Sequence, residues 1–462
     1  MQEQSAQIST VEKIITGFSD LAWGTPLLVL LLGGGIFFML YSRLLPFRYF
    51  RHAIAILTGK YDNPDEPGQI NHYQALSTAL AATVGMGNIT GVALAITMGG
   101  PGAIFWMWVS ALLGVTTKYF TCTLAVMYRG RDSNGEIQGG PMYVIVEGLG
   151  RNWKPLAIFF CLMGMIGVLP MFQVNQLTQI VRDVVLIPNG VDAGFTSNLV
   201  SGLLVSLLVG VVIFGGIKRI GRVTGRMVPV MVVLYVISVL FIIFSQPGRI
   251  IPSFALIFRD AFTAQSVLGG SLGAIVITGV RRAAFSNEAG IGTAPMAHGA
   301  AKTNEPVREG LVAMLGPVVD TIIVCTMTAL ALIMTGVWET GESDGITLTA
   351  EAFEASLPGF GSYLLTICVV VFALSTMLSF PYYGTKCFSF IFGARRSYFY
   401  KWFYILTIPV GATATLGTVV GIFDGAYALM AFPTMLSALL LSPSVVRASK
   451  DYFKRLKTNH NG

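Results

Sequence analysis

The 462-residue chain has the composition of a membrane protein: 54% of its residues are apolar, only 11% are charged, and its mean hydropathy is +0.69. These values exclude an ordinary soluble domain. The formal net charge of +7 is spread over many loops and is not gathered into one folded patch, so nucleic acid is not a predicted partner.

Eleven membrane-spanning helices are predicted in chain order. The run 73–117 is uncharged for 45 residues, which is too long for one span of roughly 20 residues, and Gly99-Gly100-Pro101 divides it. The first 20 residues lack a basic stretch followed by a cleavage site, so they predict a short polar tail and not a signal peptide. The predicted spans lie near 21–42, 73–98, 102–127, 155–181, 198–216, 227–245, 266–300, 310–336, 362–392, 402–422 and 425–446.

Lysines and arginines gather in alternate loops between these spans. Of those in the loops and the C-terminal segment, 23 fall on one side and four on the other. The richer side is cytoplasmic by the positive-inside rule. We therefore expect an extracytoplasmic tail at 1–20, one transmembrane domain at 21–446 and a basic cytoplasmic tail at 447–462. The expected location is the plasma membrane of a prokaryote, which is the inner membrane in a Gram-negative cell.

After one extra N-terminal helix, the other ten spans divide into two sets of five. A five-span unit ends on the side opposite to its start, so two consecutive copies are inverted relative to each other. The candidate copies, about 73–245 and 266–446, are nearly equal in length, and each opens with a glycine-interrupted helix. The sequence therefore predicts an all-α integral membrane fold with a 5+5 inverted repeat.

The two interruptions, at 82–91 and 285–295, are the main functional signal. A helix in lipid satisfies its own backbone, so an unwound stretch is tolerated only where the freed groups line a cavity. Paired breaks in two halves indicate the midplane binding site of a secondary transporter. A channel filter and an enzyme's nucleophile–base or metal constellation are both absent from the sequence.

The first break suits a zwitterionic amino acid. The backbone N–H groups of Gly85, Met86 and Gly87 are predicted to face the cavity, and the half-helix that follows presents its positive end to a carboxylate. The alternative is that these glycines only ease helix packing. Asn88 and Asn287 stand at matching points of the two breaks, each three residues before a glycine, and this pairing favours a site.

Four segments carry a family resemblance: GGPGAIFWMWVSALLG from Gly99, GGPMY from Gly139, residues 285–295, and YYGTKC from Tyr382. They resemble the signature of the alanine or glycine:cation symporter family, and the similarity extends over about 23–442. The resemblance implies a LeuT-type fold of about 11 helices with one additional N-terminal helix. It also implies uptake of a small neutral amino acid by alternating access, with sodium as the coupling ion and no organic cofactor.

Further substrate contacts follow from this resemblance. Gln173 and Asn175 match a Gln-x-Asn of the family's pocket, although both amides could equally form interhelical hydrogen bonds. Phe285, Gly292 and Phe380 are the expected pocket walls. Relatives commonly carry tryptophan at the position of Phe380, so this pocket is expected to be roomier than theirs.

A sodium ion prefers a cage of oxygen ligands. Unwound carbonyl groups near Ala81 and Val84 and the hydroxyls of Ser375 and Thr376 could supply it. This set is similar to a sodium site shared among LeuT-type symporters. The alternative is that both hydroxyls bond carbonyl groups of their own helix.

Charged residues within spans are functional hypotheses by default. Asp320 could ligate an ion, take part in proton coupling, or pair with Lys118 as structural support. Glu288 lies in the second break and is expected to cap the half-helix that follows. The adjacent pair Arg281-Arg282 could lie in a vestibule or gate.

The predicted function is sodium-coupled import of alanine, glycine or a similar small neutral amino acid. Proton coupling and a larger neutral substrate such as glutamine are the alternatives, and a channel or a membrane-embedded enzyme is the least supported class. The expected partners are the amino acid, sodium and membrane lipid. The sequence leaves the oligomeric state open, and a monomer is compatible with it.

Overall fold

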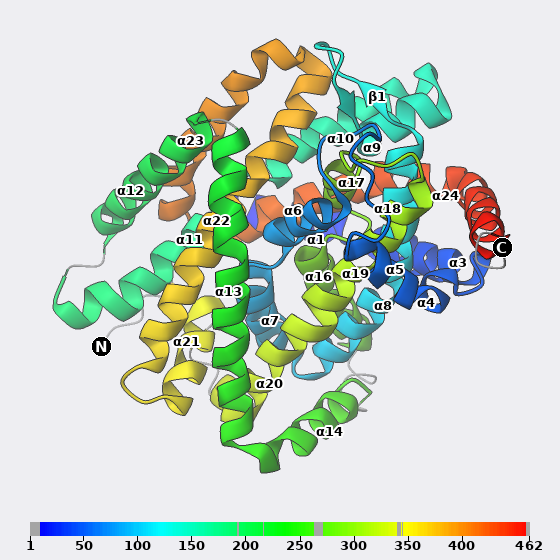
Figure 1. Ribbon diagram of the computed structural model, residues 1–462. Helices are drawn as coiled ribbons and strands as arrows, with labels where there is room; N and C mark the ends of the chain where they lie inside the picture. Colours follow the sequence, from blue (N-terminus) through cyan, green and yellow to red (C-terminus); the bar gives the residue numbers. More distant parts are fainter. Residues whose placement is uncertain are drawn as a thin grey trace.

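The computed structural model describes residues 10–191, 194–215, 217–262, 271–339, 343 and 345–458. The start of the predicted seventh span, at 266–270, and the outer ends of the two predicted tails, 1–9 and 459–462, lie outside the described residues. Apart from one two-stranded hairpin, the described elements are helices, which confirms the predicted all-α class (Figure 1).

The described helices and strands follow in chain order. The first half contains α1 Thr10–Ala22, α2 Thr25–Leu28, α3 Gly34–Tyr41, α4 Leu45–Arg48, α5 Phe50–Leu57, α6 His72–Thr83, α7 Met86–Gly99, α8 Gly102–Met127, β1 Gly130–Arg131, β2 Ile137–Gln138, α9 Pro141–Tyr143, α10 Lys154–Gly167, α11 Met171–Ile180, α12 Phe195–Phe214 and α13 Ile217–Ser245. The second half contains α14 Ile250–Asp260, α16 Ser271–Asn287, α17 Thr293–His298, α18 Pro306–Ala313, α19 Leu315–Pro317, α20 Thr326–Thr335, α21 Gly345–Ser356, α22 Gly361–Phe392, α23 Ser397–Thr413 and α24 Leu416–Thr458.

The helices confirm a multi-pass membrane protein. Among the described residues, six helices are long and apolar enough to cross a membrane, and three bent pairs raise the number to nine. These nine coincide with nine of the eleven predicted spans. The other two fall on the α16–α17 segment, whose beginning is not described, and on the 17-residue α23. The hairpin of β1 and β2 and the helix α14 lie at opposite ends of the molecule (Figure 1).

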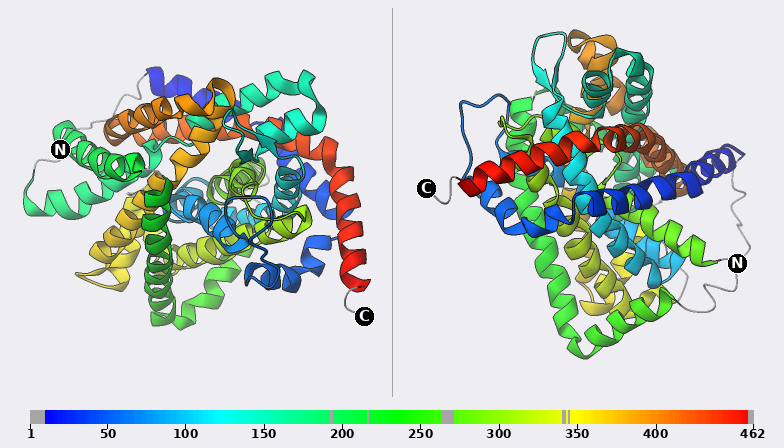
Figure 2. Two further views of the ribbon diagram at one scale, coloured as in Figure 1. Left: turned by 45° about the horizontal axis from the view of Figure 1, so that its top comes forward. Right: turned by 90° about the vertical axis from the view of Figure 1, so that its right-hand side faces the viewer.

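The N-terminal segment is helical where the sequence analysis expects a polar tail. Helix α1 begins at Thr10 and lies beside α24, as the right-hand view of Figure 2 shows. Gly421 and Gly425 of α24 open a groove for it, because a Cβ at Gly421 would lie 2.8 Å from the Ile15 side chain. The polar segment thus gains a helix from a partner about 400 residues away along the chain.

The predicted division between the last two spans, at 422–425, is wrong. The chain turns at Ala414, where the backbone is extended, and α24 then runs unbroken through Asp424. A lone carboxylate in an apolar run resembles a loop residue because burying an unpaired charge is costly. Here Arg281 and Arg282 pair with Asp424, and this contact allows the helix to continue. The helix also extends through most of the predicted basic tail.

Close contact between α8 and α18 supports the centre of the fold. A Cβ at Gly310 of α18 would lie 2.7 Å from the carbonyl oxygen of Tyr119 in α8. We predict that Gly310→Leu lowers the thermal stability of the detergent-purified protein by about 1–3 kcal/mol, the usual cost of overpacking. Gly17→Leu, at an exposed site in α1 with no neighbour within 4 Å, is the control and should melt like the wild type. Equal melting of the two variants would contradict the close packing of α8 and α18.

Candidate functional site

The first predicted break is present between α6 and α7, which meet at an angle of 43°. Val84 and Gly85 have extended backbone conformations between the two helices. The N–H of Gly85 donates to Oδ1 of Asn88 over 2.7 Å, so Asn88 caps the start of its own helix. The unwound segment is therefore only two residues long and is internally supported.

The second predicted break separates α16 from α17. Glu288, Gly290 and Gly292 adopt positive φ angles of 56°, 86° and 112°, a conformation that favours glycine. Oδ1 of Asn287 accepts the N–H of Ala289 over 2.9 Å, so this asparagine supports its break as Asn88 supports the first. Both interruptions predicted from the glycine pattern are thus real changes of backbone direction.

Glu288, which the sequence predicts to cap the second half-helix, contacts the start of that helix through a hydroxyl group. Its carboxylate accepts hydrogen bonds from two hydroxyl groups, that of Tyr427 at 2.7 Å and that of Thr293, the first residue of α17. It therefore supports the start of α17 through a side chain.

Asp320 joins the two breaks. Its Oδ1 accepts from Nδ2 of Asn88 over 2.8 Å, and its Oδ2 accepts from the hydroxyl of Ser286 over 2.6 Å. The neighbouring Thr321 accepts from Nδ2 of Asn287 over 2.9 Å. Both acceptors lie on a wide helical turn at Val318–Cys325, a type of distortion that is frequent at functional sites.

Lys118 does not neutralise Asp320 by direct pairing. Among the described residues no ion pair joins the two, and the Lys118 ammonium instead lies beside Gly316, where an added Cβ would be 3.1 Å from Nζ. The structure therefore gives Asp320 hydrogen bonds to both breaks in place of the lysine partner that the sequence suggests.

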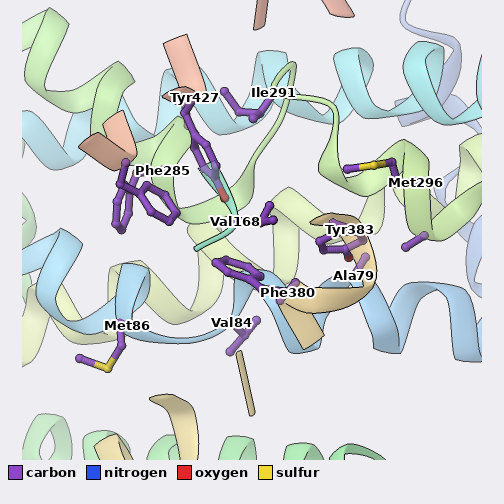
Figure 3. Packing of buried hydrophobic residues seen from close by; sticks show 14 of the residues in the cluster. Ala79, Val84, Met86, Val168, Phe285, Ile291, Met296, Phe380, Tyr383 and Tyr427 are labelled. Atoms are coloured by element: carbon purple, nitrogen blue, oxygen red, sulfur yellow. The ribbon is translucent and has the colours of Figure 1, made fainter. Parts of the chain in front are cut away.

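Aromatic rings stand over the first break. The ring of Phe285 packs on Gly87, where a Cβ would lie 3.4 Å from the ring and 3.2 Å from the Cα of Ser286. Figure 3 shows the side chains of Phe285, Phe380 and Tyr427 near one another, and all three rings lie within 6.3 Å of the Phe423 ring, centre to centre. The sequence analysis named Phe285 and Phe380 and missed Tyr427, which lies on the helix that the misplaced boundary divides.

Two predicted site residues lie outside this ring cluster. The side chain of Met86 points away from the rings in Figure 3, so only its backbone is available to the break. Gly292 packs against Phe160 and Pro141, and its positive φ makes it a turn residue of the second break.

The two amides predicted as polar contacts, those of Gln173 and Asn175, differ in their hydrogen bonding. Oε1 of Gln173 is buried and has no hydrogen-bond partner among the described residues. Nδ2 of Asn175 donates to the carbonyl groups of Gly411 and Ala414 at the end of α23, over 3.1 and 2.8 Å. Asn175 therefore makes the interhelical contact that was its alternative, whereas Gln173 retains an acceptor for a ligand.

Two further hydroxyl groups, which were not predicted from the sequence, are also buried without a hydrogen-bond partner among the described residues. They are Oγ1 of Thr83, at the end of α6, and the hydroxyl of Tyr383, in α22. Both fall in segments that the sequence analysis singled out, the glycine break and the YYGTKC motif, and their buried polar atoms need partners.

The two hydroxyl groups predicted as sodium ligands, those of Thr376 and Ser375, also differ in their contacts. Oγ1 of Thr376 reaches across to the carbonyl oxygen of Ala81 over 3.5 Å, beside Gly85 and the adjoining Val84. The hydroxyl of Ser375 donates to the carbonyl of Phe372 in its own helix over 2.9 Å. Thr376 is thus the hydroxyl that meets the break.

A cavity of about 1090 Å³ leads to this point between α6 and α22. Ala81 of α6, the candidate sodium ligand, is part of its wall. Its wall also includes Ser77 and Thr78 of α6 and Ser379 and Tyr382 of α22, and the loop of the β1–β2 hairpin contributes to its rim. This hairpin belongs to the side predicted to be cytoplasmic.

A cluster of charges covers the other side of Phe285. The Asp424 carboxylate accepts from Nε of Arg281 over 2.6 Å and from Arg282, and Arg281 also pairs with Asp20 of α1 over 2.7 Å. The Arg282 guanidinium lies 5.2 Å from the centre of the Phe285 ring. The two arginines therefore form a layer of ion pairs that joins α16 to α24 and α1.

The sequence matches the sodium:alanine symporter family over residues 8–462. It is 42% identical over 447 residues to the sodium/alanine symporter AgcS of Methanococcus maripaludis, which covers 95% of this chain and 96% of that protein. An uncharacterized transporter of Haemophilus influenzae is 42% identical over 458 residues, with 98% of both chains covered. GlnT of Bacillus subtilis, a probable sodium/glutamine symporter, is 34% identical over 466 residues, with 98% and 95% covered.

The contact between Gly87 and Phe285 predicts a steric requirement. Gly87→Leu should abolish amino-acid uptake while membrane insertion persists, because the new side chain meets the Phe285 ring and the Ser286 backbone. Gly91→Ala, four residues later on the same face, places its Cβ 3.5 Å from Phe285, which is ordinary contact, and should retain uptake. Uptake by proteoliposomes measures both variants, and unchanged uptake in Gly87→Leu would remove the first break from the site.

Proposed function

The chain belongs to the sodium:alanine symporter family, and from this membership we propose that it imports alanine, glycine or a similarly small neutral amino acid together with sodium. The chain is accordingly a multi-pass membrane transporter and not an enzyme. The proposed location is the plasma membrane of a prokaryote, with lipid around the helices. The oligomeric state stays open.

One observation carries the proposal: a hydroxyl group contacts one side of the first break, and an aromatic ring contacts the other side. The hydroxyl of Thr376 meets the Ala81 carbonyl, which suits a small hard cation, and the Phe285 ring covers Gly87, which suits a small apolar side chain. The free Gln173 oxygen supplies an acceptor that an ammonium group could use. A small amino acid and a sodium ion would then lie side by side.

Alternating access is the proposed mechanism. The cavity along α6 leads to the break from one side, and the Arg282–Asp424 layer closes the space behind Phe285. We assign this arrangement to a cytoplasm-facing state of a LeuT-type inverted repeat. Release of the Asp424 pairs together with closure of the α6–α22 cavity would expose the same site to the other side.

Two alternatives rest on specific residues. A larger neutral substrate such as glutamine is favoured by Phe380, where the family resemblance implies a roomier pocket, and the 34% identical relative GlnT is named as a probable sodium/glutamine symporter. Proton coupling is favoured by Asp320, a buried carboxylate that contacts both breaks.

Radiolabelled alanine uptake into proteoliposomes tests the function. An inward sodium gradient should drive accumulation, and unlabelled glycine should compete with alanine more strongly than glutamine does, because the Phe285 ring lies against Gly87 and limits the room for a long side chain. A panel of amino acids with and without sodium makes this measurement. Uptake that is independent of sodium and driven by a proton gradient would indicate proton coupling through Asp320. Stronger competition by glutamine than by glycine would overturn the assignment of a small substrate.

The Thr376 hydroxyl predicts a ligand effect that is separable from packing. Thr376→Val keeps the side-chain shape and loses the oxygen, so the sodium concentration for half-maximal uptake should rise by about tenfold or more, the equivalent of one lost ligand contact of about 1.4 kcal/mol. Thr376→Ser keeps the oxygen and is the control, with a nearly unchanged sodium response. The same sodium response in both variants would exclude Thr376 as a ligand.

A further inference from the structure

A buried histidine–glutamate–histidine cluster connects the two broken helices away from the candidate substrate site. His72 is the first residue of α6, His298 is the last residue of α17, and Glu309 lies in α18. All three side chains are at most 1% exposed. One carboxylate oxygen of Glu309 bonds Nδ1 of His72, and the other bonds Nδ1 of His298 at 2.5 Å.

The cluster is the main polar contact of both imidazoles. Nε2 of His72 and Nε2 of His298 are buried and have no hydrogen-bond partner among the described residues. Because each carboxylate oxygen serves a different half-helix, loss of either histidine would leave part of a buried carboxylate unpaired. Glu309 therefore holds the ends of α6 and α17 to the same point of α18.

The backbone joins the same two ends. Ile70, just before α6, forms a parallel bridge with Ala301, just after α17. The N–H of Lys302 donates to the carbonyl of Ile70 over 2.6 Å, and the N–H of Gln69 donates to the carbonyl of Ala300 over 2.8 Å. This single bridge and its flanking hydrogen bonds keep the two chain segments in a fixed register.

Arg129 binds both segments at once. Its guanidinium donates to the carbonyl oxygens of Gly299 and Thr303 after α17, over 2.8 and 3.0 Å, and to that of Pro67 before α6, over 3.1 Å. It also bonds the carbonyl of Ala301. Four carbonyl groups from two loops thus converge on one fixed cation.

Helix α6 also borders open space. Its residues Ser77 and Thr78 face the 1090 Å³ cavity, whose wall also includes Ser379 and Tyr382 of α22. Helix α6 packs against α22 as well as against α17, so the cavity opens beside this packing and does not separate the two helices. Closure of the cavity would move its α6 wall relative to its α22 wall.

We propose that His72, Glu309 and His298 form a clamp that makes the half-helices α6 and α17 move as one unit with α18 when the cavity closes. This inference rests on the proposed alternating-access function. The three are positioning residues, because the described contacts place them against one another and not at the candidate substrate or sodium ligands.

A reversible cross-link tests whether the two halves move together. Residues paired on adjacent strands lie about 4.8 Å apart, which suits a disulfide, so Ile70→Cys and Ala301→Cys should bond when combined and oxidised. Uptake by the oxidised double variant should stay within about twofold of its reduced form, since one moving unit needs no separation there. Each single variant treated with the same oxidant is the control. Loss of uptake on oxidation that a reductant restores would overturn the proposal.

The second experiment asks what the histidine does. His72→Leu removes the donor and should slow uptake by about tenfold or more, equivalent to about 1.4 kcal/mol of the transport barrier. His72→Asn keeps a donor near the position of Nδ1 and should recover most of the rate. In the His72→Leu background the oxidised disulfide between positions 70 and 301 should also restore uptake, and reducing the already folded, reconstituted protein should remove it again.

The remaining outcomes contradict the clamp. Wild-type rates in His72→Leu would show that the tie is dispensable, and a slow variant that the disulfide does not rescue would show that the cluster acts in another way. All variants are compared with the wild type under whichever amino acid and cation drive its uptake. Failure of sodium-driven alanine uptake in the wild type would therefore refute the proposed substrate and ion, and the clamp would still be decided by the ratios between variants.

Discussion

The structure depends on one constraint: a backbone group freed inside an apolar medium must find a partner within the protein. Both broken helices meet it with an asparagine beside the break. Asn88 and Asn287 each accept a backbone N–H through Oδ1, and each directs Nδ2 to neighbouring residues, Asp320 and Thr321. The two breaks therefore form one connected polar layer. The cavity, the aromatic rings and the candidate ligands are all arranged around this layer.

Buried charges fix the surrounding helices by the same logic. The Arg282–Asp424 pair brings α16 to α24, and Arg281 adds α1 through Asp20. Glu309 brings α6, α17 and α18 together through two histidines. An unpaired charge would be costly in each place, so each pairing strongly favours one packing arrangement over its neighbours.

The candidate site has two chemically different borders. Toward α22 the break meets a hydroxyl and an open cavity, and toward α16 and α24 it meets aromatic rings backed by the arginine layer. A cation and a small apolar side chain would therefore be sorted to different sides of the same two unwound residues. The free oxygen of Gln173 and the free hydroxyls of Thr83 and Tyr383 mark where polar groups of a ligand could be satisfied.

The sequence by itself determined that the fold lies in a membrane, where most of the spans are and where both breaks occur. Hydropathy and glycine content predict these features because they act on the backbone locally. Only the tertiary structure decided that α24 continues through Asp424, that α1 is a helix, and that Asn175 caps α23 while Gln173 stays free. It also selected Thr376 over Ser375 for the break and hydrogen bonds over Lys118 for Asp320. Each of these choices depends on a partner remote in the chain, and the energy of a buried polar group is set by that partner and not by its neighbours in sequence.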